Sequence, residues 1–423
     1  MAKRNADLLV VHAAELATCR GPREGLTGEA LARLEIVRDG ALALVGERIL
    51  AVGTTEEIRD QFEAPQVLDA RGRLVTPAFA DPHSHLVYGG TRHEEYETKV
   101  TRRADVRLAG GIRYTVAKTR EAADAALTAQ ALADLDVMLA HGTTLVEAKT
   151  GYGLEPQQEL RLLRLTAALR HAVEVVPTFL PLHVLPEEYR ARRAAYVKMA
   201  LDSLPEAARL ARYCDVTCDP IGFTYDECLE VGEAARALGM KLRVHADQMG
   251  EARGAALAAR LQASAADHLD SATDEGLSAM ALAGTVATLL PGVTLHLMEM
   301  AQKPFLEGLA RRAIDAGCVV ALSTDYNPGS CPTQSMQIIM QLAARLFRLG
   351  YAQIWHMCTL NAARALDCAA ERGSLEPGKR ADLLVWSVPE HGMVINRFGV
   401  NLVETVIVAG RIVRSSIKEA TCH

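Results

Sequence analysis

The chain has 423 residues, with 46 Lys and Arg against 52 Asp and Glu, which gives a formal net charge of −6. Charges of both signs are interspersed, so no basic face indicates binding to nucleic acid or to anionic lipid. Apolar residues make up 49% of the chain, which is enough for a substantial core. The length is typical of a large barrel with additions or of two to three domains.

The N-terminus and the cysteines favour a soluble, cytoplasmic protein. The first apolar run is broken by His12 and Glu15, so it is too short and too polar for a signal peptide. No stretch approaches the roughly 18 uninterrupted apolar residues that span a membrane. The nine cysteines are scattered, as is typical of reduced thiols. The one close pair, Cys214 and Cys218, lacks the second pair of a zinc knuckle, so a metal site there is the weaker alternative.

Short strands separated by turn residues are predicted near both ends of the chain. The predicted strands are 8–11, 40–53, 66–75, 381–386 and 404–413. The second of these ranges has two β-rich runs around Gly46-Glu47, which predicts a hairpin. Because both ends are rich in predicted strands and the middle is not, we expect a small β-sandwich domain formed by residues 1–75 and 371–423.

Between residues 76 and 370, short apolar runs alternate with longer amphipathic ones. The predicted strands are 74–80, 143–148, 174–180, 214–218, 241–245, 264–269, 285–290 and 318–324. The predicted helices are 121–140, 156–171, 203–212, 226–238, 250–261, 302–316 and 333–348. Strands that are each followed by a helical segment predict an α/β fold, a (β/α)8 TIM-type barrel. A doubly wound sheet is the alternative, but no Gly-rich phosphate turn follows the first strand.

Histidines and an aspartate occur at the carboxyl ends of these strands, where a barrel of this kind carries its active site. They are His83 and His85 after the first strand, then His183, His245, His268 and Asp325 after later ones. Side chains two residues apart on a strand point the same way, so His83 and His85 can face one ion. A lone histidine at a strand end is usually structural, but this succession predicts a metal site.

The predicted ligands suit one divalent ion per subunit, either zinc or iron, with manganese as a further candidate. Such an ion lowers the pKa of a bound water towards roughly 7. Asp325 can ligate the ion, and it can also take a proton from the attacking water and return it to the leaving nitrogen.

Longer motifs around these residues resemble the amidohydrolase superfamily and, more narrowly, the imidazolonepropionase family. The matching stretches include His83–Arg92, Lys149–Leu154, His245–Gln248 and Thr324–Ser330. The resemblance covers nearly the whole chain. It implies a metal-dependent hydrolase that acts on a C–N bond of a five-membered ring bearing a propionate, and it implies a homodimer.

The resemblance also implies roles for individual residues. The implied ligands of a single metal ion are His83, His85, His245 and Asp325. The implied substrate contacts are Arg92, Tyr152, His183, Gln248, Asn327, Gly329 and Ser330. Arg92 can hold a propionate bidentately while Tyr152 adds a hydroxyl. His268 and His183 can relay a proton or polarise the heteroatom of the attacked carbon, so with Asp325 they are the predicted catalytic residues.

A second metal ion is not expected, because the predicted strand before His183 ends without the lysine that bridges two ions in many superfamily members. Lys149 follows the predicted strand 143–148 instead. Glu147 is interpreted either as a further ligand or as a salt-bridged residue of the barrel.

Several positions depart from the family's usual pattern and leave the substrate open. Tyr88 and Tyr326 stand where phenylalanine is usual, and Asp247 stands where glutamate is common. The first hypothesis is hydrolysis of 4-imidazolone-5-propanoate to N-formimino-L-glutamate in histidine degradation. The alternative is a desulfhydrase that converts 3-(5-oxo-2-thioxoimidazolidin-4-yl)propionate to the hydantoin with release of sulfide in ergothioneine catabolism. A catalytically inactive scaffold is the hypothesis from another class.

Overall fold

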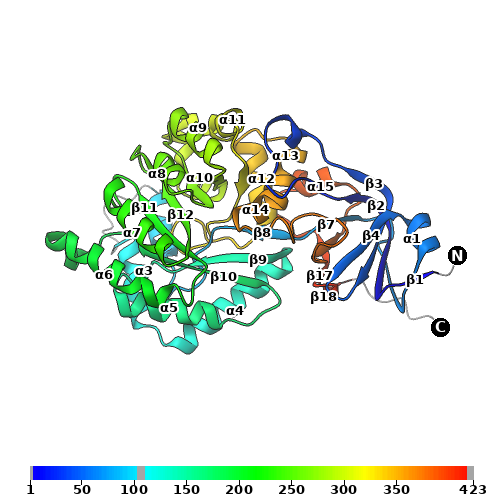
Figure 1. Cartoon of the computed structure of the whole chain (residues 1–423), viewed down its shortest axis with the longest axis horizontal. Helices are drawn as coiled ribbons and strands as arrows, with labels where there is room; N and C mark the ends of the chain where they lie inside the picture. The colour runs from blue at the N-terminus through cyan, green and yellow to red at the C-terminus, as the bar shows by residue number, and fades with distance from the viewer. Residues whose placement is uncertain (1–2, 102–109, 417–423) are drawn as a thin grey trace.

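The computed structural model describes residues 3–101 and 110–416, which contain two large sheets (Figure 1). One is an eight-stranded parallel sheet in the order β15-β14-β13-β12-β11-β10-β9-β8, curled into a barrel. Its strands are β8 (Phe79–Asp81), β9 (Thr143–Lys149), β10 (Glu174–Leu182), β11 (Tyr213–Cys218), β12 (Lys241–Ala246), β13 (Ala265–His268), β14 (Val286–Leu289) and β15 (Val320–Leu322). The predicted (β/α)8 barrel is confirmed.

Helices follow the barrel strands and cover the outside of the barrel (Figure 1). They are α2 (His93–Thr101), α3 (Ile112–Glu121), α4 (Asp124–Ala140), α5 (Pro156–Ala168), α6 (Arg193–Ala207), α7 (Tyr225–Ala237), α8 (Gly254–Arg260), α9 (Asp274–Ala283), α10 (Pro291–His296), α11 (Leu309–Asp315), α12 (Met336–Leu346), α13 (Tyr351–Cys358) and α14 (Leu360–Ala365). Short 3-10 turns are η2 (Glu187–Arg192), η3 (Glu299–Ala301) and η4 (Pro304–Gly308). The helix predicted over 302–316 is divided into η4 and α11, and Gly308, a poor helix former, lies where the two meet.

Both ends of the chain build the second sheet, in the order β18-β17-β16-β7-β2-β3-β4 with β6 paired to β2. Its strands are β2 (Leu8–Ala17), β3 (Ile36–Val45), β4 (Arg48–Thr54), β6 (Gln66–Asp69), β7 (Leu74–Pro77), β16 (Leu383–Trp386), β17 (Val403–Val408) and β18 (Arg411–Ser415). Beside it lie β1 (Arg4–Asn5), β5 (Phe62–Glu63), α1 (Thr55–Gln61), η1 (Gly28–Ala32) and α15 (His391–Asn396). The hairpin predicted at Gly46-Glu47 joins β3 to β4. The domain boundaries near residues 75 and 370 stay a prediction.

The strand predicted over 74–80 is divided between the two sheets. β7 pairs with β16 and β2 in the terminal sheet, whereas β8 pairs with β9 in the barrel. The change occurs at Ala78, whose N–H donates to the Asp382 carbonyl, while the next N–H, of Phe79, donates to the Gly142 carbonyl. Both halves of this run are fully buried and apolar. The hydrophobicity of the sequence therefore does not indicate where the chain passes from one sheet to the other.

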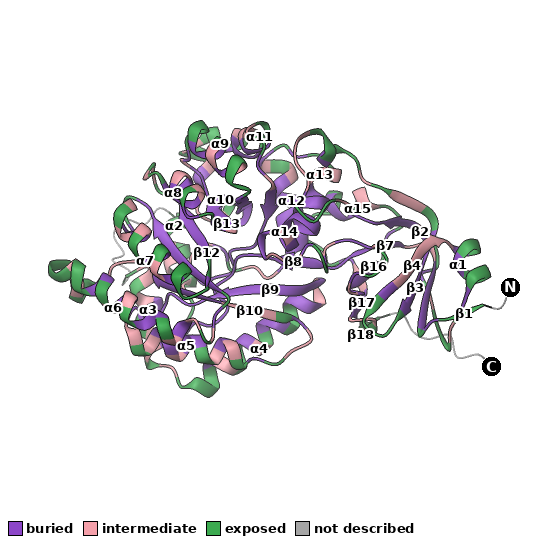
Figure 2. Cartoon of the chain, viewed as in Figure 1, coloured by how far each residue is buried: buried purple, intermediate pink, exposed green. Residues whose placement is uncertain are grey.

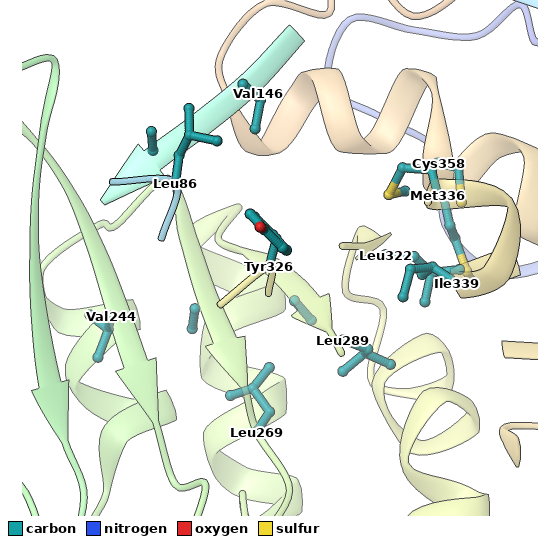
Figure 3. Close-up of a cluster of buried hydrophobic side chains, with 14 of the residues drawn as sticks. Leu86, Val146, Val244, Leu269, Leu289, Leu322, Tyr326, Met336, Ile339 and Cys358 are labelled. Carbon is teal, nitrogen blue, oxygen red and sulfur yellow. The ribbon is translucent and has the colours of Figure 1, made fainter. Parts of the chain in front are cut away.

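Strand alternation separates the core of the barrel from its polar end. Val244 belongs to the hydrophobic cluster shown in Figure 3, whereas its neighbour on β12, His245, belongs to the polar group described below. Figure 2 shows the barrel strands buried and the outer faces of the helices exposed. Successive side chains of a strand point to opposite sides of the sheet. When an apolar side chain packs against the surrounding helices, the polar side chain next to it therefore points to the inside of the barrel.

The barrel closes where β8 meets β15, close to the same polar end. The Asp81 carboxylate accepts hydrogen bonds from the Thr324 N–H at 3.0 Å and the Thr324 hydroxyl at 2.6 Å. Further on, the Asp325 N–H donates to the His83 carbonyl, and the His85 N–H donates to the Tyr326 carbonyl. We name this junction the barrel seam. Within the described parts of the chain, no helix is long and apolar enough to cross a membrane.

Candidate metal and substrate site

All the predicted metal-ligand candidates come together at the carboxyl end of the barrel. Their ligand atoms lie within 4.8 Å of one another in three overlapping groups of three residues. The groups are His83 with His85 and Asp325, His83 with His245 and His268, and His85 with His183 and His245. Asp325 Oδ1 lies 3.4 Å from His83 Nε2 and 3.6 Å from His85 Nε2.

Four of these imidazoles have a polar partner at Nδ1. His83 Nδ1 lies 2.8 Å from the Asp267 carboxylate, and His245 Nδ1 lies 3.1 Å from that of Asp215. His85 Nδ1 lies 3.4 Å from the Thr150 carbonyl, and His183 Nδ1 lies 2.8 Å from the Gly151 carbonyl. The two carboxylate contacts are close but not linear hydrogen bonds. Carboxylates and carbonyls only accept, so Nδ1 carries the proton and Nε2 keeps its lone pair.

The atoms that face one another in this group lack other partners. His83 Nε2, His245 Nε2 and Asp325 Oδ1 are buried and have no hydrogen-bond partner among the described residues. Buried polar atoms are nearly always hydrogen bonded, so such a cluster needs an explanation. Imidazole nitrogens and a carboxylate oxygen are the donors that zinc or iron(II) accepts, so these residues fit a divalent ion.

A fully buried layer of charges lies next to the histidines. Lys149 Nζ lies 2.6 Å from Asp215, 2.9 Å from Glu147 and 3.4 Å from Asp267, and Arg243 Nη2 lies 2.9 Å from Asp267. Burial opposes ionisation of Asp215, but Lys149 and His245 outweigh it and lower the pKa of this carboxyl. The pKa of Asp267 is likewise held well below its usual value despite burial, chiefly by Arg243 and Lys149. Glu147 is therefore a salt-bridged residue in this structure.

Burial also sets the protonation of the facing groups. It raises the pKa of Asp325 to about 7, and with the charge of His245 it lowers the pKa of His183 to about 4. His268 has a pKa well below its usual value, again chiefly through burial. His183 and His268 are therefore neutral at pH 7.

The loop 151–154 that carries Tyr152 is held by one buried carboxylate. Glu159 Oε1 accepts the N–H groups of Gly153 and Leu154 at 2.7 Å each, and Oε2 accepts that of Gly151 at 2.8 Å. The loop places the Tyr152 ring 5.3 Å from the ring of His85. Gly151 has φ of +112°, and a Cβ there would lie 2.8 Å from the His183 ring, so this position needs glycine.

The turn after Asp325 is held by its own side chain. Asn327 Nδ2 donates to the Asp325 carbonyl and to the Ser330 hydroxyl, both at 2.7 Å. Asn327 Oδ1 accepts the N–H groups of Gly329 and Ser330 at 2.8 Å each. These groups therefore shape the turn in this structure. Their predicted contact with substrate stays a prediction, because each would have to exchange a partner.

Of the other predicted substrate contacts, Arg92 is the one that lies against this turn in the described residues. The Arg92 guanidinium lies directly against Gly329, and the Tyr152 ring is 5.6 Å from that of His183. Gln248 is half-buried after β12, and its backbone carbonyl accepts a hydrogen bond from Lys303 at 2.9 Å.

Two of the departures from the family pattern contact each other. The hydroxyls of Tyr88 and Tyr326 are 2.7 Å apart and both side chains are buried. The third departure, Asp247, accepts the N–H groups of Ala252, Gly254 and Ala255 at 2.8–2.9 Å and so holds the start of α8. These three residues are thus explained by local packing.

Comparison with known proteins shows the family of the chain. A sequence model of the amidohydrolase family matches residues 91–414. The chain is 43% identical to the imidazolonepropionase of Symbiobacterium thermophilum, over 97% of this chain and 98% of the relative. It is 40% identical to the imidazolonepropionase of Caldanaerobacter subterraneus subsp. tengcongensis, over 96% of this chain and 97% of the relative. The chain belongs to the imidazolonepropionase family of amidohydrolases. It is therefore an enzyme, and the inactive-scaffold hypothesis has no support.

Solved structures of more distant proteins share the fold of this chain. The 5-methylcytosine deaminase of Klebsiella pneumoniae superposes with a TM-score of 0.72 at 17% identity, over 96% of this chain and 98% of that one. An atrazine chlorohydrolase from Arthrobacter aurescens, complexed with zinc, gives 0.70 at 16% identity, over 98% and 97%. At this identity, the likeness concerns the fold.

The motifs of the imidazolonepropionase family did not point to every residue that supports the site. Asp215, Asp267, Arg243 and Glu159 were missed. Three of them are charged residues inside buried barrel strands, which is a usable signal because such residues are almost always paired. Cys214 and Cys218 are buried, and no potential metal group found among the described residues contains a cysteine.

Proposed function

We propose that the protein hydrolyses 4-imidazolone-5-propanoate to N-formimino-L-glutamate. One observation carries this proposal: unpartnered ligand atoms of His83, His245 and Asp325 converge in a chain 43% identical to an imidazolonepropionase over 97% of its length. The sulfide-releasing alternative has no support in the relatives or in the geometry.

His83, His85, His245 and Asp325 would hold one divalent ion, and zinc, iron and manganese all accept these donors. When bound, such an ion supplies a nucleophile at neutral pH by lowering the pKa of water to about 7. Asp215 and Asp267 support the proposal, because they keep the protons of His245 and His83 on Nδ1.

Formation of this product breaks the bond between the ring carbonyl carbon and its nitrogen. The water oxygen ends in the new carboxylate, and the leaving nitrogen takes a proton. Asp325 and His268 are the proposed carriers of that proton, since both face the group and, at neutral pH, His268 is unprotonated and Asp325 is partly so.

His183 is proposed to act as an acceptor at Nε2. Its Nδ1–H donates to the Gly151 carbonyl, so its Nε2 offers a lone pair and no proton. We assign it to accept a ring N–H of the substrate or to relay a proton. Arg92 and Tyr152 are the proposed partners of the propionate.

The test is an assay of purified, metal-analysed protein with imidazolone propionate, following loss of the ring and formation of N-formimino-L-glutamate. Asp325→Asn is expected to lose turnover while keeping the fold. Asp202→Asn, which alters an exposed carboxylate of α6, is the matched control and keeps full activity. Sulfide release from the thioxo ring without turnover of imidazolone propionate contradicts the proposal.

A homodimer and a cytoplasmic location also belong to the proposal, and both rest on the family resemblance. Sedimentation of the purified full-length protein tests the dimer. A monomer at micromolar concentration that keeps full activity would remove it from the proposal.

A further inference from the structure

Arg92 is held by a neighbour that none of the preceding roles includes. Glu95, one turn further on in α2, accepts a hydrogen bond from Arg92 Nε at 2.9 Å and another from Nη2 at 2.6 Å. The two side chains are only 15% and 28% exposed. This is a bidentate pair, in which the carboxylate takes one whole edge of the planar guanidinium.

No described residue forms a hydrogen bond or ion pair with the opposite edge of the guanidinium. A guanidinium has five N–H donors, of which Glu95 takes two. Among the described residues, Arg92 Nη1 has no hydrogen bond or ion pair. The edge formed by Nη1 and Nη2 can therefore receive a second carboxylate without displacing Glu95.

Gly329, in the turn that follows Asp325, leaves space for the guanidinium of Arg92. A Cβ built on Gly329 would lie 1.8 Å from Arg92 Nη1, so the guanidinium occupies the space of the missing side chain. Gly329 has no left-handed φ, so its backbone alone would accept alanine. It lies in the turn that follows Asp325, which places Arg92 Nη1 near the reacting groups.

Tyr152 is the other proposed partner of the substrate carboxylate. Its ring lies 5.3 Å from the ring of His85 and 5.6 Å from that of His183. A carboxylate between Arg92 Nη1 and Tyr152 would lie on the same side of the barrel mouth as the metal-ligand candidates.

We propose that Glu95 is a positioning residue that makes the enzyme selective for rings bearing a carboxylate. It fixes the Nε–Nη2 edge of Arg92, and Gly329 provides the space in which the Nη1–Nη2 edge faces the substrate. The inference rests on the proposed function for its substrate class. The opposite role is competition, in which Glu95 occupies the arginine and weakens binding of the substrate carboxylate.

Two variants and one control separate these roles. Glu95→Gln removes the charge and one acceptor, so the bidentate pair is lost. Glu94→Gln makes the same charge change on the neighbouring exposed residue of α2 and is the control. Gly329→Ala displaces the guanidinium without changing any charge.

The measurement is calorimetric Kd on the metal-loaded, full-length enzyme, with hydantoin-5-propionate and its propionamide as ligands. The wild type and Glu94→Gln are expected to prefer the acid. Glu95→Gln and Gly329→Ala are expected to weaken binding of the acid about tenfold or more, the equivalent of losing one charge-assisted hydrogen bond. Binding of the amide should stay within about twofold, since it makes no carboxylate contact.

Three results overturn the inference. Tighter binding of the acid by Glu95→Gln shows that Glu95 competes with the substrate, and an equal loss of affinity for acid and amide shows a general change in the structure of the loop. The third is a wild type that binds acid and amide equally well. The turnover assay with imidazolone propionate is separate. An enzyme that prefers the acid through Glu95 but does not open the imidazolone ring contradicts the proposed function alone.

Discussion

Replacing Lys149 with methionine tests whether the buried charged layer supports the histidines. Lys149 is fully buried and contacts three carboxylates, of which Asp215 and Asp267 in turn contact His245 and His83. Methionine has a similar length and no charge. The variant therefore leaves three buried carboxylates with Arg243 as their remaining cation among the described residues.

The expected loss is large because these charges are out of water. Removing one partner of a buried ion pair costs about 3–5 kcal/mol of stability, since the other charge stays buried and unpaired. Weakening the partners of metal-binding histidines typically lowers metal affinity about 10–100-fold. Lys198→Met is the control: Lys198 pairs with Asp202 at 3.0 Å on the surface of α6, where both are more than 60% exposed. Such a pair contributes about 0.5 kcal/mol or less.

Urea unfolding of metal-free protein, followed by tryptophan fluorescence, gives the free energies. Trp355 and Trp386 are both buried and report on the core between the barrel and the terminal sheet. Metal affinity is measured separately by competition with a chelator, because a bound ion would itself add stability. If Lys149→Met loses no more stability than Lys198→Met and binds metal as tightly as the wild type, the supporting role is wrong.

Three further predictions concern the groups around this layer. Glu159→Gln turns an amide against backbone N–H groups, so we expect a loss of about 1.5–3 kcal/mol in urea unfolding and a higher KM from the displaced Tyr152 loop. Tyr326→Phe leaves the buried Tyr88 hydroxyl unpaired and costs about 1–3 kcal/mol, whereas the double variant with Tyr88→Phe costs less than the sum of the two single variants in a thermal-unfolding cycle. Asp325 with a pKa of about 7 must lose a proton to bind an ion. Metal affinity of the metal-free protein should therefore rise about tenfold per pH unit below about 7 and level off above it, as measured by competition titration.

The barrel and most of the site could be predicted because both follow from local patterns. Apolar runs followed by amphipathic segments mark strand and helix, and polar residues that end such runs lie at one end of the barrel. His83, His245 and Asp325 each follow this rule. The distribution of 74–80 between two sheets could not be predicted, because a strand buried on both faces is apolar in either sheet.

The supporting groups could not be predicted for a different reason. Lys149, Asp215 and Asp267 lie on strands far apart in the chain, and their pairing depends on the order and register of the barrel. Glu159 lies on α5, where a glutamate ordinarily faces solvent; only the fold turns it towards the backbone of the 151–154 loop. Tyr88 and Tyr326 depart from the family pattern at positions far apart in the sequence, and only the fold of the barrel seam brings their hydroxyls to 2.7 Å from each other.

The barrel seam links the positions of the candidate metal ligands to those of the residues proposed to bind the substrate carboxylate. One loop of the seam carries His83 and His85 and leads to Arg92; the other carries Asp325 and leads to Gly329. Backbone hydrogen bonds join the loops in both directions, from the Asp325 N–H to His83 and from the His85 N–H to the Tyr326 carbonyl. The distance between the proposed ion and the proposed carboxylate contact is therefore set by the backbone of two short segments. A substitution that shifts either segment should change metal affinity and selectivity for the acid together, whereas one at Glu95 should change selectivity alone.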